Sequence, residues 1–63
     1  MAVPNRDEII LGCRVAIIQK QNQRSGELTE GIVAEILTNS SSHLHGIKVR
    51  LDSGEVGRVQ KIL

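Results

Sequence analysis

The sequence has no phenylalanine, tyrosine or tryptophan among its 63 residues. Those rings build three kinds of binding site: the cage around a methylated lysine, the groove for a proline-rich peptide, and the platform on which a nucleobase stacks. Their absence argues against all three. A chain of this length forms one small domain, which leaves no room for a large enclosed active-site cavity.

Cysteine and long apolar runs are also scarce. The single cysteine, Cys13, cannot form an internal disulfide. No apolar run approaches the roughly 20 residues that a membrane span needs. Because the N-terminus carries no signal-peptide pattern either, we expect a cytoplasmic protein with no membrane partner.

Branched aliphatic residues, in contrast, are abundant: eight Ile, six Val and six Leu. β-Branched side chains favour strands. Stretches rich in them predict four strands, over residues 14–19, 27–37, 47–51 and 55–63. A polar loop (20–26), a polar linker (38–42) and a tight turn (52–54) connect these strands.

The N-terminal residues predict a separate short element. Asn5, followed three positions later by Glu8, has the spacing of a helix capping box, and Gly12 limits the helix to a turn or so. We therefore divide the chain into a flexible N-terminal segment with a helical turn (residues 1–8) and one β-barrel domain (residues 9–63).

A short motif occurs twice and suggests how the strands assemble. Residues 31–37 match residues 57–63 at Gly, Val, Ile and Leu, and each copy follows a Ser-Gly-Glu turn. Two hairpins that each have one apolar face can bury both faces by closing on each other. The repeat thus predicts a mainly β fold, in the form of a small antiparallel barrel.

Strand alternation predicts an irregularity in the second copy. Val56 and Val59 are an odd number of residues apart, so a regular strand would point them to opposite faces. A β-bulge at Gly57 would place both inside, and Gly31 would play the same part in the first copy. The bulged register brings two pairs of outward side chains together, Arg50 with Arg58 and Lys48 with Gln60.

The chain resembles known families. The strand, loop and Gly-x-Val-x-x-Ile pattern is similar to the KOW motif of SH3-like barrels in ribosomal and transcription-elongation proteins. Nearly the whole chain resembles the YwbE-like family of small prokaryotic proteins, which implies one SH3-like barrel of four to five strands. That family has no assigned biochemical role, so no catalytic residue carries over. The matching segments are Gly12-x-x-Val15, Leu28-Thr29-x-Gly31-x-Val33, Ile36-Leu37-Thr38-Asn39-Ser40, His45-Gly46-Ile47-Lys48-Val49-Arg50-Leu51 and Gly54-x-Val56-Gly57-Arg58-Val59-Gln60-x-Ile62-Leu63.

The strongest functional feature is a cluster of cations near the C-terminus. Residues 38–63 hold four basic and two acidic side chains, whereas the net charge of the whole chain is only +1. Like charges opposite each other on two strands are destabilising, and an anion over them would relieve the repulsion. Phosphate groups would give sequence-independent, salt-sensitive affinity. The candidate nucleic-acid-binding residues are the cations Lys48, Arg50, Arg58 and Lys61, together with the hydrogen-bonding Gln60 and Asn39.

The same cations have a simpler interpretation. Charged outward faces are common in small sheets, and Asp52 and Glu55 would neutralise this one locally. Arg58 would then form an ordinary surface ion pair with one of those carboxylates.

The other reactive side chains predict no further chemistry. His43, His45 and Cys13 lack the spacing of a metal site, so we expect His45 to satisfy loop backbone groups and Cys13 to fill the core. The sequence has no nucleophile with a matching base and no glycine-rich phosphate loop before a helix. We expect a protein that is not an enzyme and has no cofactor, metal or small-molecule substrate.

Two functions remain. The first is a binding module that contacts RNA or a ribonucleoprotein through backbone and shape rather than base sequence. The alternative is a protein-interaction module or homo-oligomer, which would use an incompletely closed barrel edge or the outward aliphatic residues Ile18 and Ile32.

Overall fold

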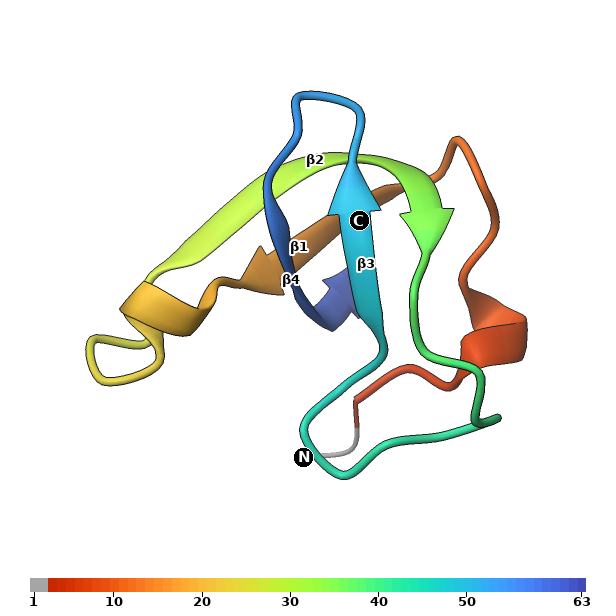
Figure 1. Ribbon diagram of the computed structural model, residues 1–63, viewed down its shortest axis with the longest axis horizontal. Helices are drawn as coiled ribbons and strands as arrows, with labels where there is room; N and C mark the ends of the chain where they lie inside the picture. The colour runs from red at the N-terminus through yellow and green to blue at the C-terminus, as the bar shows by residue number, and fades with distance from the viewer. Residues whose placement is uncertain (1–2) are drawn as a thin grey trace.

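The computed structural model describes residues 3–63, so residues 1 and 2 of the predicted N-terminal segment lie outside the described residues. Within this range the chain forms four strands, and each begins and ends within one residue of its predicted bounds. They are β1 (Arg14–Ile18), β2 (Leu28–Ile36), β3 (Lys48–Leu51) and β4 (Val56–Ile62) (Figure 1). The same range contains two 3-10 turns, η1 (Arg6–Glu8) and η2 (Lys20–Asn22).

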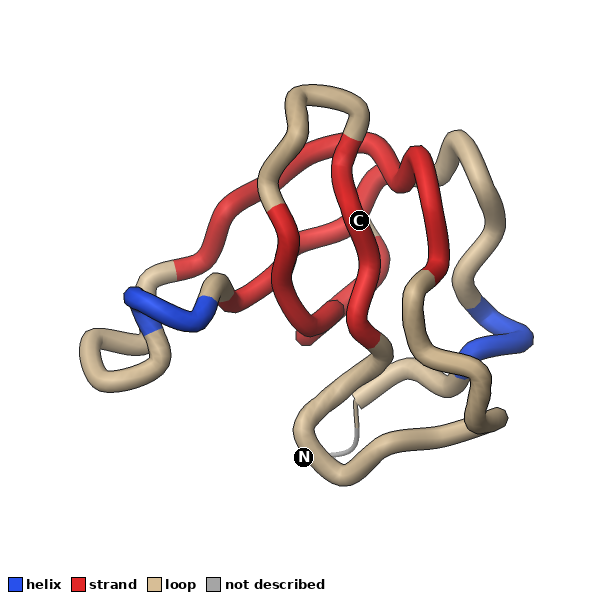
Figure 2. The backbone as a smooth tube through the Cα atoms, viewed as in Figure 1, coloured by secondary structure: helices blue, strands red, loops and turns tan. Residues whose placement is uncertain are grey.

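The four strands close into one antiparallel barrel (Figure 2). Each strand pairs with the next along the chain, and β4 returns to pair with β1. The long β2 bends so that its first half pairs with β1 and its second half with β3. The predicted SH3-like barrel is confirmed. Because a closed sheet has no free edge, the open barrel edge of the alternative prediction is wrong.

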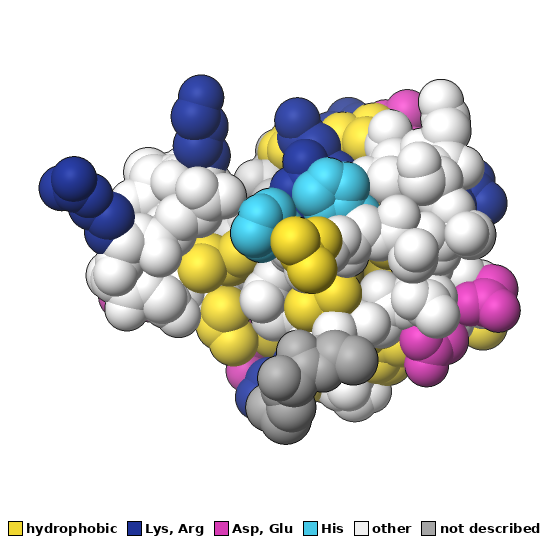
Figure 3. Space-filling model, turned by 90° about the horizontal axis from the view of Figure 1, so that it is seen from below, with side chains coloured by type: hydrophobic (Ala, Val, Ile, Leu, Met, Phe, Trp, Pro, Cys, Tyr) yellow, Lys and Arg dark blue, Asp and Glu magenta, His cyan; other side chains and the backbone are white. Residues whose placement is uncertain are grey.

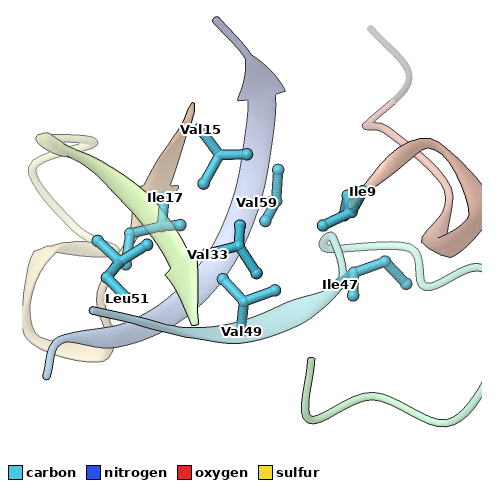
Figure 4. Close-up of a cluster of buried hydrophobic side chains, with 8 residues drawn as sticks. All are labelled: Ile9, Val15, Ile17, Val33, Ile47, Val49, Leu51 and Val59. Carbon is cyan, nitrogen blue, oxygen red and sulfur yellow. The ribbon is translucent and has the colours of Figure 1, made fainter. Parts of the chain in front are cut away.

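An aliphatic core fills the barrel (Figure 4). On β3 the burial alternates strictly, with Val49 and Leu51 inside and Lys48 and Arg50 exposed. Small branched side chains therefore fill a four-stranded barrel without any aromatic ring. The buried cluster consists of Ile9, Val15, Ile17, Val33, Ile47, Val49, Leu51 and Val59.

The predicted bulge at Gly57 is wrong. β3 and β4 pair in an uninterrupted register that places Val49 opposite Gly57, Lys48 opposite Arg58 and Arg50 opposite Val56. The predicted pairs, Arg50 with Arg58 and Lys48 with Gln60, therefore do not form. The parity argument failed because Val56 is not a core residue: its side chain is 37% exposed, whereas that of Val59 is fully buried.

The irregularities lie three residues further along each copy of the repeat. The register between β2 and β3 shifts at Ala34, between Val33 and Glu35. The register between β1 and β4 shifts at Gln60, because Ile17 pairs with Val59 while Ala16 pairs with Lys61. Ala34 and Gln60 occupy the same position in the two copies, so each copy contributes one strand irregularity of the kind that helps a small barrel to close.

The two glycines of the repeat instead allow close contacts inside the barrel. A Cβ at Gly57 would lie 2.5 Å from the backbone oxygen of Ile18, so β4 can approach β1 only because this residue has no side chain. A Cβ at Gly31 would lie 2.6 Å from Leu51 Cδ1, which is the end of a flexible side chain. At these two positions the repeat therefore provides space for a close neighbour and not a β-bulge.

The N-terminal turn packs onto the polar linker. The predicted helical turn is confirmed as η1, and Glu8 Oε2 accepts a hydrogen bond from the Asn5 N–H at 2.7 Å. The Arg6 N–H donates to the Ser41 oxygen at 2.8 Å, and Arg6 Nε donates to the Thr38 oxygen at 2.9 Å. The flexibility of residues 1–8 stays a prediction. Neither helical turn in residues 3–63 has the length or apolar character that crossing a membrane requires.

We predict that Gly57→Ala destabilises the protein by about 1–3 kcal/mol, because its methyl group meets backbone that cannot move without disturbing the β1–β4 pairing. Gly31→Ala is the matched change in the first copy, and it should cost less because Leu51 can adopt another rotamer. Urea unfolding followed by far-UV circular dichroism measures both losses, since the chain has no tryptophan fluorescence. An equal or larger loss for Gly31→Ala would contradict this account of barrel closure.

Candidate nucleic-acid interface

Two cations lie directly opposite each other on the outside of the barrel. Lys48 of β3 pairs with Arg58 of β4 in the strand register, and the residues beside them, Val49, Gly57 and Val59, are buried. Arg58 pairs on its other side with Ile18, the last residue of β1. Since η2 begins two residues after Ile18, the fold brings a third cation, that of Lys20, to the same region.

The three cations line an open groove of about 350 Å³. Among residues 3–63, no Asp or Glu contributes to its lining. A concave surface lined by charges of one sign concentrates the field and attracts ions of the opposite sign. The groove is lined by Ile18, Lys20, Gln21, Gln23, Lys48, Val56, Gly57 and Arg58.

The ion pairs of the described chain lie elsewhere. Arg14 Nη2 is 3.2 Å from Glu30 Oε1, and Arg50 Nη2 is 2.8 Å from Glu35 Oε1. Within residues 3–63, the three cations of the groove have no carboxylate within ion-pair distance. Their charge is therefore available to an anionic ligand.

Arg58 has a different partner from the carboxylate that the simpler interpretation expects. Its Nη1 donates to the backbone oxygen of Gly46 at 3.0 Å, which leaves most of the guanidinium donors unused. Glu55 accepts a hydrogen bond from the Ser53 hydroxyl. That bond, aided by a backbone hydrogen bond, lowers the pKa of the Glu55 carboxyl from its ordinary value. Within residues 3–63, Glu55 forms no ion pair with Arg58.

The structure separates three of the predicted site residues from the groove. Arg50 is exposed on β3, but Glu35 of β2 already pairs with it. Lys61 is exposed opposite Ala16, and Asn39 is exposed in the polar linker. None of the three lines the groove. Of the predicted set, Lys48 and Arg58 meet in it.

Gln60 lies in a second hollow, of about 450 Å³, that adjoins the groove. The two hollows share Ile18 and Gln23, and the second is completed by Val3, Leu44, His45 and Gln60. Figure 3 shows the histidine side chains in the middle of one face, with Lys and Arg side chains and hydrophobic side chains close beside them. The surface next to the cations is therefore mixed, partly apolar and partly polar.

Side chains of β4 hold the loop at residues 43–46, which contributes Leu44 and His45 to the second hollow. Gln60 Nε2 donates to the His45 oxygen at 3.0 Å and to the Arg58 oxygen at 3.2 Å, while Arg58 reaches the Gly46 oxygen. Gly46 has a φ of +103°, and a Cβ there would collide with the backbone oxygen of Val59. Glycine therefore lets the loop lie against β4, where Arg58 and Gln60 fasten it.

His43 and Cys13 have structural roles. It is His43, rather than the predicted His45, whose side chain satisfies a backbone group: its Nδ1 accepts the His45 N–H at 3.1 Å. Cys13 is half-buried and packs against the core, as expected. Within residues 3–63, no three His, Cys, Asp or Glu side chains gather closely enough to hold a metal ion.

The outward aliphatic residues of the alternative prediction are only partly exposed. Ile18 and Ile32 are both half-buried, and Ile18 contributes to the lining of both hollows. The most exposed large aliphatic side chains of the described chain are instead Ile10 (67%), Leu11 (61%) and Leu44 (87%).

The sequence analysis places Lys20 in a polar loop and does not include it among the cations of the site. The missing information was tertiary, because Lys20 approaches Lys48 only when β1 pairs with β4. A usable signal was present in Lys20 and the two glutamines after it, three long polar side chains that directly follow a strand. Loops that a rigid scaffold positions in this way commonly carry binding residues.

Comparison with known proteins places the chain in a family. The family described as "Uncharacterized conserved protein (DUF2196)" matches residues 2–62. The chain belongs to this family. It is also 50% identical over 58 residues to "Uncharacterized protein YwbE" of Bacillus subtilis (strain 168), which covers 92% of this chain and 89% of that protein. No solved structure matches the chain.

The YwbE-like resemblance is thereby confirmed, whereas the similarity to the KOW motif stays a prediction. Neither description names a ligand or a reaction for members of the DUF2196 family. What this member binds has to be inferred from the groove.

We predict that Gln60→Ala loosens the loop at residues 43–46, because it removes both hydrogen bonds from Nε2. A loss of about 1 kcal/mol in local stability corresponds to roughly 5-fold faster hydrogen exchange at the His45 and Gly46 amides. Lys61→Ala is the matched control, since Lys61 is exposed and its side chain makes no hydrogen bond within residues 3–63. Equal exchange rates in the two variants would show that Gln60 does not hold the loop.

Proposed function

We propose that this DUF2196 protein binds RNA, free or within a ribonucleoprotein, by holding backbone phosphates in its cationic groove. One observation carries the proposal: Lys20, Lys48 and Arg58 line a single open groove to which no carboxylate of residues 3–63 contributes. Two of these cations face each other across neighbouring strands, an arrangement that is unfavourable alone and becomes favourable when an anion lies between them.

The chemistry of the lining suits phosphate. Lys20 and Lys48 are exposed and can each place an ammonium group against a phosphate oxygen. Arg58 is half-buried and anchored through Nη1, so its guanidinium loses little further freedom when it binds an anion with its remaining donors. The amides of Gln21 and Gln23 add neutral hydrogen-bonding groups. Such contacts position a nucleic acid without reading its sequence.

The other candidates extend the proposed site beyond the groove. Arg50 would contribute only by exchanging Glu35 for a phosphate. Lys61 and Asn39 would meet a longer RNA outside the groove, and Gln60 lies in the adjoining hollow. We propose the largest contribution from the three unpaired groove cations.

A second candidate function, a protein-interaction module, has one observation in its favour. Ile10 and Leu11 are neighbours in the chain and are both more than 60% exposed. Adjacent exposed aliphatic side chains on a small protein are typical of contact surfaces. Ionic strength separates the two functions, because an apolar contact hardly responds to added salt.

We predict that a short labelled RNA binds with a strong salt dependence, measured by fluorescence anisotropy at several salt concentrations. Three phosphate contacts give a slope of about −2 for log binding constant against log salt concentration, at about 0.7 per contact on a single strand. Between 50 and 200 mM salt the affinity should fall roughly 20-fold. Lys48→Gln should reduce the steepness of the slope by about 0.7.

Lys48 suits this test because its side chain makes no hydrogen bond within residues 3–63, whereas Arg58 also anchors Gly46. Arg14→Gln is the matched control: it removes the same charge from a cation that lies outside the groove and is paired with Glu30, and it should leave the slope unchanged. Absence of RNA binding at low salt, or an unchanged slope in Lys48→Gln, would overturn the proposal.

A further inference from the structure

We infer that the hollow beside the groove holds an unstacked nucleobase against the imidazole ring of His45, so that the ligand is single-stranded RNA. This inference rests on the proposed function and specifies the kind of RNA. The groove and the second hollow are continuous, because Ile18 and Gln23 line both. An RNA strand whose phosphate lies in the groove can therefore extend directly into the second hollow.

The chain has no Phe, Tyr or Trp, but histidine also carries a ring on which a base can stack. His45 lines the hollow and is exposed to solvent. Its ring lies 5.9 Å from the ring of His43, centroid to centroid, at an angle of 47°. Imidazole is among the rings on which proteins stack unpaired RNA bases.

The backbone of His45 is fixed from both sides. The His43 Nδ1 accepts its N–H, and Gln60 Nε2 donates to its oxygen. Both contacts involve main-chain atoms of His45, so its ring takes part in neither. A ring on a fastened loop loses less conformational entropy when a base stacks on it than a ring on a mobile loop would.

The remaining surface of the hollow fits a base. Leu44, Val3 and Ile18 supply apolar contact, and Leu44 is 87% exposed although it is a large aliphatic residue. Gln60 Nε2 donates to two backbone oxygens, those of His45 and Arg58. Its Oε1 accepts no hydrogen bond within residues 3–63 and is available to a ligand. A base has apolar faces and a hydrogen-bonding edge, and this lining offers a counterpart to both.

Hydrogen bonds also connect the hollow to the groove. Arg58 lines the groove and donates to Gly46, the residue after His45, while Gln60 donates to the Arg58 oxygen. The phosphate contact and the proposed base contact therefore belong to one hydrogen-bonded unit. Bases within a duplex are paired and stacked, so only a single strand can place a base in the hollow.

The test compares three ligands of equal length carrying the same label: a single-stranded RNA, the same strand with abasic sites, and a duplex RNA. Binding of the single strand to the Lys48→Gln protein is measured alongside. His45→Ala should weaken binding of the single strand roughly 5-fold. The affinity for the abasic strand and the slope of log binding constant against log salt concentration should stay unchanged. The variant keeps the backbone contacts of His45, and far-UV circular dichroism checks its fold.

His45→Trp supplies a second readout, because the chain otherwise contains no tryptophan. The larger ring should bind the single strand more tightly than histidine does, and its fluorescence should be quenched by the single strand but not by the abasic strand or the duplex. Quenching of that pattern, together with the loss in His45→Ala, supports the inference.

The outcomes distinguish this inference from the proposed function. If His45→Ala binds the single strand as the wild type does, or the duplex binds as tightly as the single strand, the base site is refuted. The proposed phosphate binding is still supported if Lys48→Gln makes the dependence of affinity on salt concentration less steep. If no ligand binds even at low salt, the proposed function fails, and the base site fails with it.

Discussion

The approach of β4 to β1 at Gly57 is the contact on which the rest of the structure depends. Only a residue without a side chain fits against the backbone oxygen of Ile18, and this fit lets the last strand close the sheet on the first. Closure removes the sheet edges and completes a core made entirely of aliphatic side chains. It also places Arg58 beside Ile18, so the cationic groove is a direct product of barrel closure.

The two copies of the repeat build similar backbones with different surfaces. Each copy has a glycine at a tight contact and a register shift three residues later. Where the second copy has Arg58 and Gln60, the first has Ile32 and Ala34. The β4 side chains that fasten the loop, Arg58 and Gln60, therefore have no counterpart in the first copy, although the scaffold is nearly symmetric.

The fold tolerates a groove lined by unpaired cations because charge repulsion costs much less free energy than burial of the core provides. Two like charges across neighbouring strands at the surface cost under about 1 kcal/mol, because water screens them. Burying a single Ile or Val side chain contributes about 1.5–3 kcal/mol, and the core holds eight buried aliphatic residues from the strands and their flanks. Arg58 also contributes a hydrogen bond to the Gly46 oxygen. The repulsion between Lys48 and Arg58 is thus small compared with the stability that the buried core provides. An anionic ligand can relieve this repulsion, but the protein does not need the ligand in order to fold.

The sequence alone determined the strands, their order and the family. β-Branched runs, turn residues and a repeated motif are local features of the chain, so they can be recognised without knowing which strands pair. It also identified Lys48 and Arg58 as outward cations, since alternation in a strand is local too. Only the tertiary structure decided the register: the bulges lie at Ala34 and Gln60, and Arg50 faces Glu35 rather than Arg58. A shift of one residue changes every cross-strand neighbour, and its position depends on how four strands close around a core, which no single strand encodes. For the same reason Lys20, distant from Lys48 in the chain, joined the groove only once the barrel closed.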